Sequence, residues 1–120
     1  MDIINVAAKI EEKIKLLEKG RLLLDERAQA KANAIAEYEK SLAKTAMLLK
    51  NSDDPIVFDG VTFHKLPVTL IPQAAKGICY QNKINMDLAE SRYKIAIEGL
   101  RCIEAELNGY QSIFRHLDEK

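Results

Sequence analysis

The stretch PIVFDGVTFHKLPVTLI, residues 55–71, decides the fold, because it separates two long segments that carry a helical pattern. At its centre the pair Asp59-Gly60 stands between two short runs, IVF and VTF, that are rich in β-branched and aromatic residues. An Asp-Gly pair in this setting predicts a tight two-residue hairpin turn, since such a turn needs positive φ angles. We therefore predict a small β-hairpin between two helices.

The predicted turn pairs Phe58 with Val61, Val57 with Thr62 and Ile56 with Phe63. It also fixes which side chains share a face, because side chains alternate across a strand. One face of the hairpin is wholly apolar, and it consists of Ile56, Phe58, Val61 and Phe63. A two-stranded hairpin alone is marginally stable in water, so this face must be covered. Covering by the chain itself or by a second subunit is the favoured interpretation. The alternative makes these four residues the surface that binds a partner protein. A third strand after the hairpin is allowed only at the edge, because it contains Pro67.

The segment before the hairpin, about residues 2–50, has apolar residues at steps of three and four with a few polar interruptions. This spacing predicts a heptad-like helix. Gly20 costs about 1 kcal/mol inside a helix but need not end one. We predict one long helix, with Gly20 as the place for any kink. Its seam consists of Ile3, Ala7, Ile10, Ile14, Leu17, Leu24, Ala28, Ile35, Tyr38, Leu42 and Leu49.

The segment after the hairpin, about residues 74–117, shows the same spacing without interruption and predicts a second long helix. Gly99 and Gly109 lie inside it, and we expect both to face a closely packed helix. The seam is Ala89, Tyr93, Ala96, Leu100, Ile103, Leu107, Tyr110, Phe114 and Leu117. A second apolar stripe runs beside it and consists of Ile84, Leu88, Ile95 and Cys102.

Together these segments predict a mainly α fold, a long antiparallel helical hairpin with a small β-hairpin inserted, as a single domain over residues 1–120. Each helix carries more apolar surface than one partner helix can cover. The excess predicts self-association into a homo-oligomer, a dimer or a larger bundle.

Composition excludes several classes of protein. Eighteen basic residues balance eighteen acidic ones, so the formal net charge is zero, which argues against a general nucleic-acid binder. The sequence shows neither a signal peptide nor an apolar run of the ~20 residues that a membrane span needs. We expect a cytosolic protein that does not enter a membrane, with Cys79 and Cys102 as buried free thiols.

Few residues suggest chemistry. His64 and His116 have no neighbouring ligands at the spacing of a metal site, and no serine stands in a recognisable nucleophile arrangement. There is no glycine-rich phosphate loop. We therefore expect neither an enzyme nor a bound cofactor or metal.

Three stretches carry a resemblance to a known group: AEYEKSLAKTAMLLKN (36–51), PVTLIPQAAKG (67–77) and MDLAESRYKIAIEGLRCIEAELNGYQSIFRHLDE (86–119). The chain resembles small helical proteins encoded among the early genes of bacteriophages and prophages of Gram-positive bacteria. The hairpin insert is longer than in that pattern. The resemblance implies a phage-encoded accessory protein of the bacterial cytosol, and it carries over no catalytic residues.

Two kinds of function follow from this resemblance. The first is an interaction module whose oligomer binds a host or phage protein in replication, recombination or anti-defence. The second is a binder of a small nucleotide signal between subunits, or a weak nucleic-acid binder. Nucleic acid is not favoured, because acidic and basic residues alternate along both helices. An anionic ligand would need converging basic and aromatic groups, for which the candidates are Lys76, Tyr80, Arg92, Tyr93 and Arg101.

Overall fold

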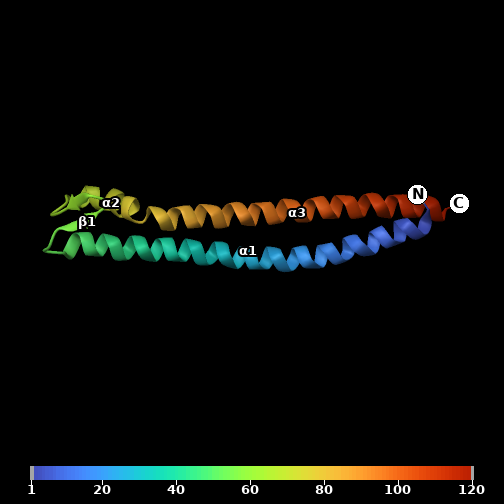
Figure 1. Cartoon of the computed structure of the whole chain (residues 1–120), viewed down its shortest axis with the longest axis horizontal. Coiled ribbons are helices and arrows are strands. Elements are labelled where there is room, and N and C mark those ends of the chain that lie inside the picture. Colours follow the sequence, from blue (N-terminus) through green and yellow to red (C-terminus); the bar gives the residue numbers. More distant parts are fainter. Residues whose placement is uncertain (1, 120) are drawn as a thin grey trace. The chain divides into compact units, whose positions relative to one another are not determined.

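The computed structural model describes residues 2–119 and has the predicted helical hairpin with an inserted β-hairpin (Figure 1). In chain order the elements are α1 (Ile3–Asn51), β1 (Ile56–Phe58), β2 (Val61–Phe63), the 3-10 helix η1 (Val68–Leu70), α2 (Ile71–Ile78) and α3 (Tyr80–Asp118). The described residues form two compact units. The terminal unit contains the chain up to Gln29 and from Ser91 onward, and the hairpin unit is Ala30–Glu90.

Helix α1 begins at a side-chain cap and continues without a break to Asn51. The carboxylate of Asp2 accepts a hydrogen bond from the backbone N–H of Asn5 at 2.8 Å, which satisfies a free donor of the first turn. Gly20 does not end the helix. A Cβ atom at Gly20 would lie 2.6 Å from Cδ2 of Leu100, so this glycine allows the leucine to pack against the backbone of α1.

In the terminal unit, α1 and α3 run in opposite directions (Figure 1). Two residues of the predicted α1 seam, Ile3 and Ile14, stay exposed in this unit. Leu17 and Leu100 are buried there, together with Val6, which lies outside the predicted seam. An ion pair joins the helices between Lys13 and Glu106. The Lys13 side chain is 16% exposed and that of Glu106 is 51% exposed, so this pair lies at the edge of the seam.

The hairpin unit is built around a cluster of three buried residues, Leu49 of α1 with Ile71 and Ala75 of α2. Half-buried Ile56 and Phe63 of the β-hairpin pack against this cluster. The hairpin therefore docks on its own chain, the first of the arrangements considered from the sequence. The other half-buried hydrophobic residues around the cluster are Leu42, Ala46, Leu66, Ala74 and Ile78.

The β-hairpin has the predicted register, with Ile56 opposite Phe63, Val57 opposite Thr62 and Phe58 opposite Val61. Its turn places two residues at positive φ, 51° at Asp59 and 76° at Gly60. Two successive positive φ angles match the mirror-image turn that suits the right-handed twist of the strands.

The segment between the hairpin and α3 differs from the expectation. No third strand forms there in the described residues: Val68–Leu70 is the 3-10 helix η1, and α2 already begins at Ile71. Pro72 lies in the first turn of α2, where a missing N–H costs nothing because that donor has no partner within the helix. The second long helix is also interrupted at Cys79, whose ψ angle of 22° separates α2 from α3.

Three further expectations about single residues were wrong. A Cβ atom at Gly99 or Gly109 would meet no atom within 4 Å, so neither glycine faces a packed helix within the described chain. The close approach occurs at Gly20 instead. Cys79 is a buried free thiol as expected, but Cys102 is exposed.

Candidate functional site

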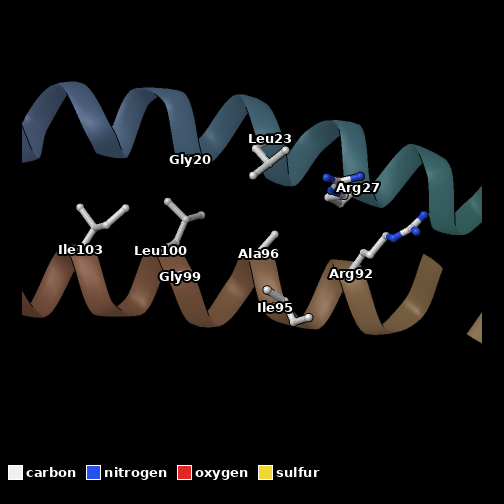
Figure 2. Close-up of a pocket in the computed structure, with 9 residues that line it drawn as sticks. All are labelled: Gly20, Leu23, Arg27, Arg92, Ile95, Ala96, Gly99, Leu100 and Ile103. Carbon is white, nitrogen blue, oxygen red and sulfur yellow. The ribbon is translucent and has the colours of Figure 1, made fainter. Parts of the chain in front are cut away.

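The terminal unit contains a groove between α1 and α3 with a volume of about 290 Å³ (Figure 2). Its walls are mainly aliphatic, and Leu23 from α1 points toward the opposite helix, as do Leu100 and Ile103 from α3. Small residues on the α3 side, Ala96 and Gly99, leave room in the groove. The full lining is Gly20, Leu23, Arg27, Arg92, Ile95, Ala96, Gly99, Leu100 and Ile103.

Two arginines from different helices lie at the same end of this groove, Arg27 on α1 and Arg92 on α3 (Figure 2). Arg27 is half-buried and Arg92 is exposed. Within residues 2–119, neither guanidinium group has a hydrogen bond or an ion pair with a carboxylate. The groove thus combines an apolar floor with uncompensated positive charge at one end, a combination that favours a ligand with an anionic group.

The hairpin unit carries a second surface, which we call the Met47–Val68 patch. It surrounds a shallow hollow of about 220 Å³ whose lining is Ala46, Met47, Lys50, Val68, Ile71 and Pro72. Met47 is 64% exposed and Val68 is 73% exposed, although both are large and apolar. Exposed apolar side chains around a hollow are typical of a surface that contacts another protein.

The four residues predicted to bind a partner have different surroundings. Ile56 and Phe63 pack on the core of their own chain, and the Phe58 ring lies edge-on to Tyr80 with centroids 6.2 Å apart. Val61 remains 55% exposed. The apolar face of the hairpin is therefore mostly covered within the chain.

The five residues predicted to hold an anionic ligand fall into the two units. Lys76 and Tyr80 belong to the hairpin unit, whereas Arg92, Tyr93 and Arg101 belong to the terminal unit. The guanidinium group of Arg101 donates to Glu98 at 2.7 Å, and both side chains are exposed. Of the five, Arg92 is the residue that lines the groove.

The pKa of Lys13 is shifted by its contact with α3. A hydrogen bond from Lys13 to Glu106 stabilises the ammonium form and raises the pKa of Lys13 above its ordinary value of 10.5, against a smaller opposing effect of desolvation. This group ties α1 to α3 and lies outside the groove lining, so we assign it to stability.

Comparisons and searches give no function directly. Comparison of the chain with protein-family models, with curated proteins and with solved structures found no match. Among residues 2–119, no three His, Cys, Asp or Glu side chains come together as metal ligands. No helix in this described part combines the length and the apolar character of a membrane span.

The sequence did not indicate that Gly20 and Arg27 line a groove. Arg27 was interpreted as one charge of an alternating helix surface, and Gly20 as a weak point of a helix. The missing information was the register of α1 against α3, which places Gly20 against Leu100 and brings Arg27 to the groove that Arg92 lines. Heptad spacing identifies the seam of each helix but leaves this register undetermined.

Proposed function

We propose that the chain is a non-catalytic interaction module that forms a homo-oligomer and binds a second protein. One observation carries the proposal: within residues 2–119, eight hydrophobic side chains are buried, while sixteen large hydrophobic side chains stay exposed. Soluble monomers seldom leave so much apolar surface uncovered, and helix pairs cover it by joining further helices.

Self-association is best supported by the second apolar stripe of α3. Ile84 is 44% exposed, Leu88 is 48% exposed and Ile95 is 70% exposed. Ile84 and Leu88 are four residues apart, so they lie next to each other on one side of the helix. This spacing suits the seam of a helical bundle.

Sedimentation equilibrium of the purified chain tests the oligomer. We expect a mass of two or more times the chain mass of 13.5 kDa. The double variant Ile84→Lys/Leu88→Lys should lower that mass, whereas Asn85→Lys, an exposed polar position on the same turn, should leave it unchanged. A wild-type mass equal to one chain would refute the self-association.

The second protein would bind the Met47–Val68 patch. The resemblance to phage early-region proteins supports a host or phage protein of the bacterial cytosol as this partner, in replication, recombination or anti-defence. The patch takes over the role first expected of Ile56, Phe58 and Phe63, because those three side chains contact their own chain.

Quantitative affinity purification from phage-carrying bacteria tests the partner. We expect one protein to be enriched with the wild-type chain and with Thr69→Lys, an exposed polar position in η1, and to be reduced at least tenfold with Met47→Lys/Val68→Lys. Equal recovery with all three chains would reject the patch as the binding surface.

A further inference from the structure

The groove of the terminal unit has open space beside Gly99. A Cβ atom at Gly99 would meet nothing within 4 Å, so the space beside this glycine is open. At Gly20 the corresponding space is filled by Leu100. The volume of about 290 Å³ lies at the low end of the range for small-molecule sites. It suits a ligand of about ten non-hydrogen atoms, if each takes roughly the volume of one water molecule in the liquid.

The two arginines define the charge of that ligand. Arg27 and Arg92 come from different helices to one end of the groove, and neither is neutralised by a carboxylate within residues 2–119 (Figure 2). Two like charges at one place favour an anion between them. The planar guanidinium group suits a carboxylate or a phosphate, because its N–H groups can bind two oxygens of either group at once.

The rest of the lining defines the body of the ligand. Apart from the two arginines, every lining residue is glycine or carries an aliphatic side chain. A nucleobase placed here would lose the hydrogen bonds of its polar edges, and that loss disfavours binding. An alkyl chain has no such bonds to lose and gains from contact with Leu23, Ile95 and Ile103.

We propose that this groove binds an aliphatic carboxylate of medium chain length. The carboxylate lies between Arg27 and Arg92, and the alkyl chain runs along the groove past Gly99. This binding activity goes beyond the proposed interaction module. It shares Ile95 with the apolar stripe of α3, but it uses neither Ile84 and Leu88 nor the Met47–Val68 patch.

Isothermal titration of the full chain with decanoate, below the concentration at which decanoate forms micelles, tests the proposal. We expect saturable binding of one decanoate per chain. 1-Decanol lacks the charge and should bind at least tenfold more weakly, as should butyrate, which lacks most of the chain. Adenosine monophosphate should not bind measurably. Binding of the nucleotide in place of decanoate would overturn the proposal, as would the absence of decanoate binding.

Two variants locate the site. Arg27→Gln/Arg92→Gln should weaken decanoate binding at least tenfold, and Gly99→Leu should abolish it by filling the open space. Gly109→Leu is the matched control, because it introduces the same side chain at an open glycine of the same helix outside this groove. Unchanged binding by the double arginine variant and by Gly99→Leu would overturn the proposal.

The sedimentation mass of the same variants separates the ligand from a second copy of the chain. We expect Gly99→Leu to keep the wild-type mass. A reduced mass would show that another copy fills the groove, and the proposal would then fail even if the chain is an oligomer.

Discussion

The terminal unit and the hairpin unit each contain one stretch of α1 and one of α3, but polar links of different kinds join their helices. In the terminal unit the link is the charged pair Lys13–Glu106. In the hairpin unit two of the links are neutral: Asn82 donates to the hydroxyl of Ser41 at 3.1 Å, and the hydroxyl of Thr45 lies 3.3 Å from the sulfur of Cys79. The ammonium group of Lys83 also lies 5.9 Å from the centroid of the Tyr38 ring. Neutral links of this type do not depend on salt, whereas an exposed ion pair is screened by it.

The two units also differ in how their apolar side chains are enclosed. Leu49 is surrounded by α2 and the β-hairpin as well as by neighbouring turns of α1. Leu100 packs on Gly20, and Ile103 also lies near this glycine. Leu100 and Ile103 both border the open groove as well. A third layer of structure therefore encloses the core in one unit, and its absence leaves a groove in the other. This difference suggests that the closed core of Leu49, Ile71 and Ala75 serves stability, whereas the groove of the terminal unit serves binding.

Truncation of one buried leucine in each unit should produce the largest effects and should test this difference in enclosure. Leu→Ala changes in closed cores cost about 2–5 kcal/mol, and the cost rises with the volume of the cavity left behind. We expect Leu49→Ala to cost about 3 kcal/mol of unfolding free energy. Leu100→Ala should cost about 2 kcal/mol, because it widens a groove that is already open. Urea unfolding followed by circular dichroism, at one fixed protein concentration, measures both values.

Hydrogen exchange of the same variants shows where the loss occurs. Exchange should rise within residues 30–90 for Leu49→Ala and within residues 2–29 and 91–119 for Leu100→Ala. Leu49→Met, which conserves volume, is the control and should cost less than about 1.5 kcal/mol. An equal or larger loss for Leu100→Ala would contradict the difference in enclosure.

The sequence alone predicted the two helices, the β-hairpin and its register, because each depends on local spacing. Asp59-Gly60 fixes the turn, and the turn fixes the pairing of Ile56 with Phe63. Features that depend on contacts between distant segments could not be predicted in this way. The spacing of Ile71, Ala74, Ala75 and Ile78 marks an apolar helix face, but it does not show that this face packs on Leu49.

The candidate site was predicted less well than the fold. Arg92 was one of the five residues predicted to hold an anionic ligand, and it lines the groove, whereas the place of Arg27 in the same lining follows only from the register between α1 and α3. The apolar stripe of Ile84, Leu88 and Ile95 was predicted from its helical spacing beside the main seam of α3. All three residues are exposed in the structure.

A substitution in the β-turn should have an intermediate effect that is confined to the hairpin unit. Gly60 has a φ of 76°, and an L-residue with a Cβ atom is strained there, so Gly60→Ala should cost about 1 kcal/mol. Gly77→Ala is the matched control, because Gly77 lies in α2, meets nothing within 4 Å of a built Cβ atom, and gains helix propensity as alanine. Urea unfolding should show opposite signs for the two changes. Equal effects would mean that the turn geometry does not limit the stability of the hairpin.

Removal of the Lys13–Glu106 ion pair should have the smallest effect on stability, and the dependence of that effect on pH identifies its origin. Because the folded-state pKa of Lys13 is raised, its contribution is fully present below the ordinary value of 10.5 and is lost as pH rises through the folded-state pKa. Lys13→Gln should therefore lower the thermal midpoint at pH 8, by less than Gly60→Ala does, and the difference from wild type should shrink above pH 10.5. Lys15→Gln, an exposed position on the same helix, is the control and should show no such change with pH. A deficit in Lys13→Gln that stays constant across this pH range would assign the role of Lys13 to the packing of its aliphatic stem. The contact of Lys13 with α3 would then be a packing contact that does not depend on charge.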